Sequence, residues 1–284
     1  MITRNGKKYY SNKIMEDQKT NDSTPWNVGD VTVRNYLDSC NEAFTDDSKF
    51  SVFKKDPRYT NILEHSSYDE SLIYISMLEK DKKKVIDKIN LLKENDIYGS
   101  PDLRDYNLWE NNHTLSPSTI RYIKNSVDII NYFGNGIKTI AEIGGGYGGL
   151  CKTMSCFYDF DKYYIFDLPE VNNLSSKYLS MFNLSERTVS DVLDNANLSK
   201  IDLLISNYAF SELSRDVQKK YIDNVIKKAK YFYIIDNHFS TNLYQTPGFT
   251  YDELALELSD YDIVVEDEIS YGNKIYYGKI KSKK

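Results

Sequence analysis

The segment from Ile140 to Gly149 constrains the fold of this chain more than any other. It reads Ile-Ala-Glu-Ile-Gly-Gly-Gly-Tyr-Gly-Gly, so an apolar run ends in a carboxylate and then in five glycines. An apolar segment that can form a helix, Leu150 to Tyr158, follows directly. Glycine permits positive φ and lets a ligand approach the main chain, and the N–H groups at a helix start can bind that ligand. The pattern therefore predicts a strand, a ligand-binding loop and a helix.

Two classes of cofactor fit this loop. Gly144, Gly146 and Gly149 match the G-x-G-x-x-G pattern of dinucleotide-binding proteins. Glu142 together with Gly144, Gly146 and Gly148 matches E-x-G-x-G-x-G, the pattern of class I S-adenosylmethionine (SAM) methyltransferases. The glycines alone do not decide between the two classes.

A second carboxylate, Asp167, follows the apolar segment 162–166. A carboxylate at the carboxyl end of a neighbouring parallel strand can accept hydrogen bonds from both ribose hydroxyls of a nucleoside cofactor. The sequence Asp167-Leu168-Pro169 also has the form of a helix start, where the aspartate would be a cap. Its spacing from the glycine loop favours the ribose role.

Strands and helices alternate along the chain from residue 139 onward. Strands are predicted at 139–143, 163–166, 187–189, 202–206 and 231–235, and helices at 150–158, 171–182 and 215–229. Such alternation indicates a parallel sheet with helices on both faces. Two further strands, 261–269 and 274–280, flank Tyr271-Gly272-Asn273 and predict a hairpin. The expected fold is α/β: a doubly wound, mostly parallel seven-stranded sheet that ends in an antiparallel hairpin, with an N-terminal helical cap.

Three regions are expected along the chain. Residues 1–25 are polar and lack apolar periodicity, which is typical of a mobile tail. Residues 26–115 show helical apolar spacing with breaks up to about residue 112, and we assign them to a helical cap on the acceptor side. Residues 116–284 begin with a helix at Ser116-Pro117 and form the Rossmann-like cofactor domain. The late glycine loop and the final hairpin favour a methyltransferase over an NAD-dependent oxidoreductase.

Composition excludes several classes of function. A formal net charge of −6 argues against a nucleic-acid substrate. The sequence contains no transmembrane run and no secretory signal, so no stable membrane insertion is expected. Cys40, Cys151 and Cys156 are odd in number and lack C-x-x-C spacing, which indicates reduced thiols in a cytoplasmic protein. No metal site is predicted because no ligand cluster has recognisable spacing. The sequence does not decide whether the protein forms an oligomer.

Three further segments carry a family resemblance: Tyr164 to Val171, Leu204 to Leu213 and Tyr233 to His238. Together with the glycine loop they resemble the sugar O-methyltransferase family of class I SAM-dependent methyltransferases, over roughly residues 90 to 240. The Asp-Leu-Pro-x-Val element is also similar to small-molecule O-methyltransferases of plants and bacteria. The resemblance implies a SAM-dependent O-methyltransferase that acts on a sugar hydroxyl, with a small-molecule or glycan acceptor, in glycan or secondary-metabolite assembly.

The resemblance also implies roles for individual residues. Those implied to hold the methionine end of SAM are Glu142, Gly144, Gly145, Gly146, Tyr147 and Gly148. Asp167 would bind the ribose hydroxyls, Leu168 would pack on the adenine, and Asp191 and Val192 would contact the adenine edge. Ser206 and Asn207 would lie beside the sulfonium and the reacting methyl group. Separately, Arg121 on the helix before the first strand could pair with the SAM carboxylate, although a solvated helix charge fits equally well.

The general base is harder to assign. In the plant-type enzymes a histidine base stands where this chain has Asn207, and an amide cannot accept a proton at neutral pH. We rank His238 first, because it follows the fifth strand two residues after Asp236, which would orient it or bind the acceptor. Glu212 comes next, although a helix start explains it as well. A methyltransferase of a phenolic or other small-molecule hydroxyl, and a non-catalytic SAM-binding protein, remain alternatives.

Overall fold

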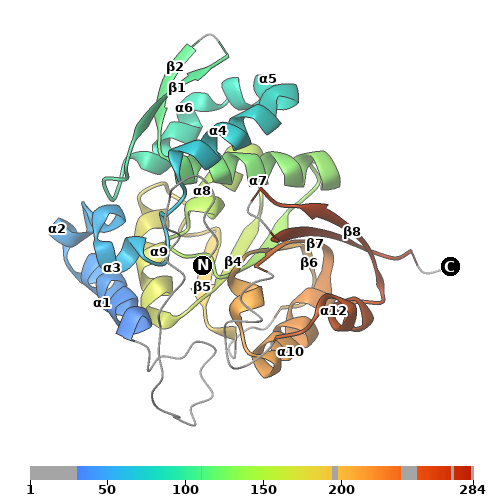
Figure 1. The fold of residues 1–284 in the computed structure, drawn as a ribbon. Helices are drawn as coiled ribbons and strands as arrows, with labels where there is room; N and C mark the ends of the chain where they lie inside the picture. The colour runs from blue at the N-terminus through green and yellow to red at the C-terminus, as the bar shows by residue number, and fades with distance from the viewer. Residues whose placement is uncertain (1–30, 110, 194–197, 238–247, 270–271, 283–284) are drawn as a thin grey trace, which may run out of the picture.

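The computed structural model describes residues 31–109, 111–193, 198–237, 248–269 and 272–282. A seven-stranded sheet lies at its centre, in the order β5-β4-β3-β6-β7-β9-β8 (Figure 1). Its strands are β3 (Thr139–Ile143), β4 (Lys162–Phe166), β5 (Thr188–Asp191), β6 (Ile201–Asn207), β7 (Ala229–Asp236), β8 (Tyr261–Asp267) and β9 (Lys274–Ile280). Strands β3 to β7 are parallel, and β9 pairs antiparallel with both β7 and β8. The predicted α/β fold is confirmed.

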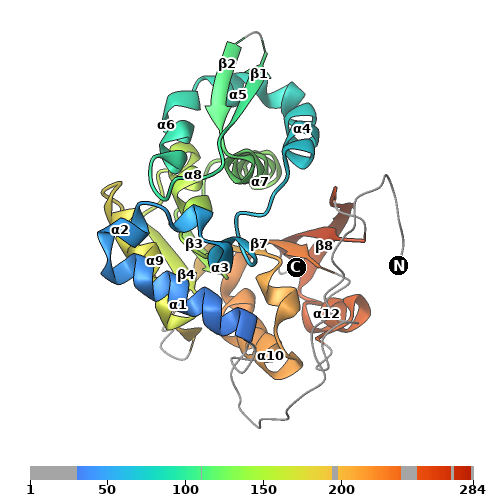
Figure 2. The same cartoon turned by 60° about the vertical axis from the view of Figure 1, so that its left-hand side comes forward.

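Helices cover both faces of this sheet (Figures 1 and 2). One face carries α7 (Pro117–Phe133), α8 (Gly149–Phe157) and α9 (Pro169–Ser180), and the other carries α10 (Arg215–Asn224) and α12 (Tyr251–Glu257). Along β3, Ile140 packs toward the first layer while Ala141 and Ile143 pack toward the second. A strand buried on both faces explains why these segments are apolar throughout rather than alternating.

One predicted helix was too long. The helix predicted at 215–229 ends at Asn224 and is followed by a 3-10 turn, η6 (Ile226–Lys228), and then by β7. Val225 leaves helical geometry at φ −127° and ψ −58°, yet Val225 and Ile226 are both buried in the core. Because the apolar spacing continues past the break, periodicity could not mark the end of this helix.

The N-terminal region contains short helices and one hairpin. Its helices are α1 (Val31–Thr45), α2 (Asp47–Phe50), α3 (Pro57–Thr60), α4 (Tyr68–Met77), α5 (Lys82–Ile86) and α6 (Ile89–Lys93), with 3-10 turns η1 (Phe53–Lys55), η2 (Leu78–Asp81) and η3 (Glu94–Asp96). Strands β1 (Arg104–Leu108) and β2 (Asn111–Leu115) pair antiparallel. The helical interpretation was therefore wrong near residues 104–112, where Tyr106 and Leu108 alternate into the core with strand rather than helix spacing.

The N-terminal region packs on the sheet domain in two separate parts. Helices α4 to α6 and the hairpin share a core with α7, whereas α1 lies along α9 (Figure 2). Ser116 caps α7, because its hydroxyl accepts a hydrogen bond from the Thr119 N–H; the domain boundary expected at this point stays a prediction. None of the described helices is both long and apolar enough to cross a membrane.

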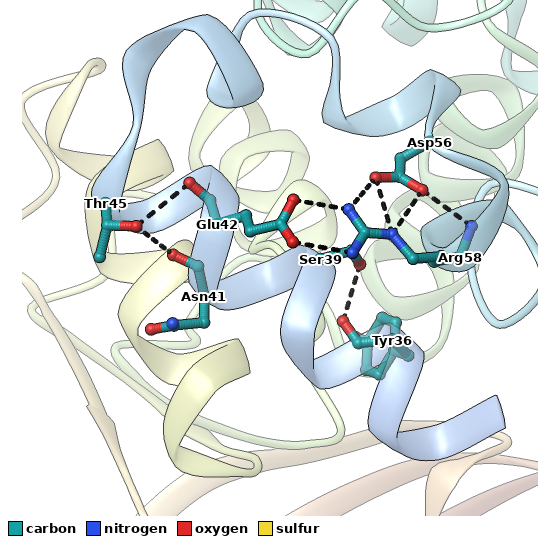
Figure 3. A network of polar contacts seen from close by, with 7 residues as sticks. All are labelled: Tyr36, Ser39, Asn41, Glu42, Thr45, Asp56 and Arg58. Carbon is teal, nitrogen blue, oxygen red and sulfur yellow. Dashed lines mark hydrogen bonds and ion pairs between the residues drawn. The ribbon is translucent and has the colours of Figure 1, made fainter. Parts of the chain in front are cut away.

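An arginine clamp fixes α3 to α1 (Figure 3). The Arg58 guanidinium donates to both carboxylate oxygens of Glu42 at 2.8 and 2.6 Å, and to Asp56 Oδ2 at 2.7 Å. Hydrogen bonding to Arg58 lowers the pKa values of both carboxyl groups. A two-pronged guanidinium–carboxylate pair has a defined geometry, so the clamp sets where the chain leaves α3. The segment that follows, residues 61–66, leads into the site.

Candidate cofactor and acceptor site

A cavity of about 240 Å³ opens at the carboxyl ends of β3, β4 and β6. The predicted site residues that line it are Arg121, Glu142, Gly144, Gly145, Gly146, Asp167, Leu168, Asn207 and Glu212. Strand β3 lies between β4 and β6, so the chain runs from β3 toward one edge of the sheet and later returns to the other side. Ligands of open α/β sheets bind at such a point.

The glycine loop has the shape of a ligand cradle. Gly144 and Gly146 have φ values of +73° and +54°, which side-chain-bearing residues rarely adopt. A Cβ on Gly144 would overlap Ala209 beside the cavity. The Gly144 N–H donates to the carbonyl of Phe166 at 2.9 Å and so closes the loop against β4. The main chain of this loop therefore carries no side chain on the cavity side.

Asp167 is bound to this loop. Its Oδ2 accepts from the Gly146 N–H at 2.9 Å, and its Oδ1 accepts from the Leu168 N–H at 2.8 Å. Burial raises the pKa of the carboxyl to about 6, against the opposing effect of these two hydrogen bonds. Each carboxylate oxygen keeps a lone pair for a further donor. The position therefore suits a group with two adjacent hydroxyls.

Glu142 lies deeper, beneath the loop, and is 2% exposed. Its Oε2 accepts from the Tyr163 hydroxyl at 2.8 Å. Burial raises its pKa to about 8, so the carboxyl is mostly protonated at neutral pH when no cation is near. A cationic ligand group in the cavity would favour the ionised form.

Glu212 and two amides line the cavity near the carboxyl ends of β6 and β7. Asn207 ends β6, and Asn237 follows β7. Burial raises the pKa of Glu212 to about 7, while a hydrogen bond with Asn237 acts in the opposite direction. A carboxyl with a pKa near neutrality can accept a proton from a bound hydroxyl, because it is ionised in a useful fraction of molecules.

Tyr208 is strained and directly follows Asn207. Its φ of +68° is unusual for a bulky residue. The Tyr208 N–H donates to the Ile235 carbonyl at 2.8 Å, and its own carbonyl accepts from the Ser211 hydroxyl at 2.6 Å. Backbone strain of this kind costs about 1–3 kcal/mol and is concentrated at functional sites.

Arg121 brings a buried cation to the cavity. The residue is 7% exposed, and its guanidinium stands 5.6 Å from the ring of Tyr122 and 5.9 Å from that of Tyr208. Its Nε is buried without a hydrogen-bond partner among the residues that the structure describes. An unused donor on a desolvated guanidinium favours an anionic ligand group, such as a carboxylate.

Three predicted residues of the loop and of β6 have structural roles outside the cavity. The Tyr147 side chain is 1% exposed and packs behind the loop against the rings of Phe53 and Tyr178. Gly148 is the left-handed N-cap of α8, at φ +90°. The Ser206 hydroxyl donates to the Ile143 carbonyl and accepts from the Phe210 N–H. None of these three residues lines the cavity, and the cofactor roles expected of Tyr147, Gly148 and Ser206 stay predictions.

The remaining predicted residues lie elsewhere. Asp191 ends the edge strand β5 and accepts from the Val192 N–H at 2.7 Å; neither residue lines the cavity, and their adenine contact stays a prediction. Asp236 also lies outside the cavity lining and hydrogen-bonds the phenol of Tyr276. His238 lies outside the described residues, so its role as base stays a prediction. Among the described residues, no three His, Cys, Asp or Glu side chains come together as a metal site.

Sequence reasoning missed several cavity residues. Tyr208 and Asn237 follow strand ends, which was a usable signal. Tyr122, Leu150, Ala209 and Asn273 also line the cavity. A further group comes from the N-terminal region: Val33, Tyr36, Ile62, Leu63, His65, Ser66, Glu70 and Tyr74. The residues of this N-terminal group are far from the glycine loop in the sequence and carry no motif, so their contribution emerged only from the packing of α1, of residues 61–66 and of α4.

No family model and no curated protein matches this sequence. Solved structures with a similar fold include an S-adenosylmethionine-dependent methyltransferase from Clostridium acetobutylicum (12% identity, 57% of this chain and 92% of that chain, TM-score 0.47). Others are a SAM-dependent methyltransferase from Aquifex aeolicus (21%, 55% and 89%, 0.42) and the mitomycin 7-O-methyltransferase MmcR (10%, 89% and 70%, 0.46). At such identities and TM-scores these similarities carry no argument about activity. The strand order itself is that of the Rossmann-like methyltransferase fold.

Proposed function

We propose that this protein is a SAM-dependent O-methyltransferase that transfers a methyl group to a sugar hydroxyl. The proposal rests on one observation: the glycine loop, Asp167 and the candidate base Glu212 all line the same cavity. A nucleoside cofactor on the loop would then have its reactive end beside the acceptor. A dinucleotide would fit the loop as well, but the buried Glu142 and Arg121 favour a ligand with an amino-acid end.

Each residue has a distinct role in this proposal. Asp167 accepts the ribose hydroxyls, Leu168 packs on the adenine, and the backbone of 144–146 borders the methionine portion. Arg121 pairs with the amino-acid carboxylate and Glu142 faces its ammonium group. Main-chain groups at the start of α8 complete the cradle. These roles use the unpaired Nε of Arg121 and the free lone pairs of Asp167 described above.

The protein residues have two tasks in methyl transfer. SAM supplies a methyl group on a positively charged sulfur, which leaves as a neutral thioether. Asn207 and Tyr208 orient the acceptor so that its oxygen lies in line with the carbon–sulfur bond that breaks. Glu212 takes the hydroxyl proton as the new carbon–oxygen bond forms, a task that Asn207 cannot perform. Charge balances, because the sulfonium charge is neutralised as one proton moves to a carboxylate.

The acceptor side of the cavity supports a polyhydroxylated substrate. Its lining contains three amides, Asn207, Asn237 and Asn273, together with Glu212. A sugar presents several hydroxyls that can each donate and accept hydrogen bonds, so it would satisfy such a lining. The rings of Tyr74 and Tyr208 favour the second candidate, a phenolic acceptor, since a flat ring would pack against them.

An assay with two panels of acceptors tests the proposal. The purified protein is incubated with SAM and with nucleotide sugars, glycans or phenols, and the masses of the products are measured by mass spectrometry. A single added methyl group on a sugar, absent without SAM, is the expected result. Methylation confined to phenols would favour the second candidate, and SAM binding without any methylated product would favour a non-catalytic SAM-binding protein.

Replacing Asp167 by alanine should weaken binding of S-adenosylhomocysteine (SAH) by about 1.5–3 kcal/mol, because charge-assisted hydrogen bonds to both ribose hydroxyls are lost. Titration calorimetry measures this change. Asp262→Ala is the matched control, because Asp262 is exposed on β8. Equal affinities in the two variants would remove Asp167 from the site.

The pKa of Asp167 also predicts how affinity depends on pH. Hydroxyl donors favour the ionised carboxylate, so binding should lower its pKa from the ligand-free value of about 6. SAH affinity should therefore show a step that belongs to Asp167, with affinity declining as the pH falls through 6. In Asp167→Ala this step should be absent. A step of the same size in parent and variant would assign the titration to another group.

A further inference from the structure

We propose that the N-terminal region binds the nucleoside half of the cofactor: α1 and residues 61–66 form one wall of the adenosine pocket. This inference rests on the proposed function, because it concerns which part of SAM each wall of the cavity contacts. It differs from the sequence-based assignment of residues 26–115 to the acceptor side.

Helix α1 approaches the ribose end of the site. Val33 and Tyr36 are three residues apart, lie on one helix face, and both line the cavity. Helix α1 packs along α9, which begins directly after Asp167 and Leu168. The Lys177 ammonium of α9 donates to the carbonyls of Ala43 and Phe44 and holds the end of α1 in place. The cavity-lining face of α1 therefore stands near Asp167 and Leu168.

Residues 61–66 cover the glycine loop. A Cβ built on Gly146 would lie 2.7 Å from Leu63 Cδ1, so the Leu63 side chain rests on the bare Cα of that glycine. The Gly146 N–H is bonded to Asp167, and Leu63, Gly146 and Asp167 therefore converge on one end of the cavity. Ile62 lines the same space. Apolar side chains beside a carboxylate that can bind ribose hydroxyls suit a nucleoside, because ligand pockets combine a mostly apolar lining with a few polar groups.

The cover is held under strain. Glu64, next to Leu63, has a φ of +60°, and its Oε1 is buried without a hydrogen-bond partner in the described part of the chain. The Arg58 clamp on Glu42 fixes the start of this segment to α1 (Figure 3). Such strain persists where the surrounding structure determines the conformation, and it is typical of ligand-contacting segments. The two parts of the wall are therefore joined to each other.

Arg121 brings a different chemistry to the cavity. Its guanidinium lies near Tyr122 and Tyr208, and its charge acts on Glu64 and His65 of the covering segment. SAM consists of a nucleoside and an amino acid. The apolar side chains of Val33, Ile62 and Leu63 suit the nucleoside, and the Arg121 guanidinium suits the carboxylate of the amino acid.

Two ligands separate these contributions. SAH has both ends of the cofactor, whereas 5′-methylthioadenosine keeps the nucleoside and lacks the amino acid. In the double variant Ile62→Ala/Leu63→Ala, calorimetry should show about a tenfold or greater loss of affinity for both ligands, by the same factor, since buried methyl and methylene groups are removed. The matched control is Leu72→Ala/Ile73→Ala, which removes the same groups from exposed positions of α4 and should bind as the parent does. Arg121→Gln should weaken SAH and leave methylthioadenosine unaffected.

The outcomes are distinct. A parent that binds neither ligand contradicts the proposed function itself. A parent that binds, with a double variant of equal affinity or one impaired for SAH alone, overturns the adenosine wall. Amide hydrogen exchange of the parent gives a second test that requires no folded variant. Methylthioadenosine should slow exchange in residues 61–66, and unchanged exchange there would overturn the inference.

Discussion

Replacing Glu212 by glutamine is expected to lower kcat by about 10²–10⁴-fold while SAH affinity stays close to that of the parent. Glutamine keeps the size and the hydrogen bonds of the side chain but cannot take a proton. Glu212 lines the cavity and burial brings its pKa to about 7, so the parent's kcat should fall as the pH drops below 7, where the base becomes protonated. Steady-state kinetics over a pH series with a methylated acceptor measures both effects.

Two further variants make this result specific. Glu186→Gln carries the same change at an exposed position and should be as active as the parent. His238→Ala addresses the base that the sequence ranked first, and a loss of about 10²-fold or more in that variant alone would assign the proton to the histidine. A Glu212→Gln enzyme that keeps most of its kcat would rule out the glutamate.

Replacing Gly146 by valine should abolish SAH binding, with a loss of at least about 100-fold, because the new side chain occupies ligand space and φ is +54°. The Cβ alone would already press on Leu63. Gly136→Val is the control: it adds the same groups in the turn before β3, where a Cβ meets nothing within 4 Å. Calorimetry measures affinity, and circular dichroism shows whether each variant is folded. A folded Gly146→Val protein with parental affinity would mean that the loop is a turn without a ligand.

The part of the cavity around the glycine loop could be predicted from the sequence because its determinants are local. A glycine loop between a strand and a helix has one structural solution, and β3, β4 and β9 lie close to their predicted bounds. Parallel strands then bring Glu142, Asp167 and Asn207 to one edge of the sheet without further information. Each of these three residues lines the cavity.

The remaining part of the cavity depends on contacts between segments that are far apart in the sequence. Such contacts produce no periodic pattern of apolar residues. Leu63 and Tyr36 have the spacing of ordinary core residues in the sequence. Their position beside the glycine loop results from the way α1 packs on α9. The hairpin β1–β2 was read as helix because Tyr106 and Leu108 alternate over too short a stretch to stand out. Glu212 looked like a helix cap, and its candidacy as base depends on burial, which sequence does not report.

Titration calorimetry of the unmodified protein with SAH, and separately with NAD, tests the central claim most directly. The account predicts saturable binding of one SAH per chain at pH 7.5 or above and no measurable heat with NAD. Binding should weaken as the pH falls through 6, where Asp167 becomes protonated. Saturable binding of NAD with no response to SAH would contradict the account and assign the glycine loop to a dinucleotide.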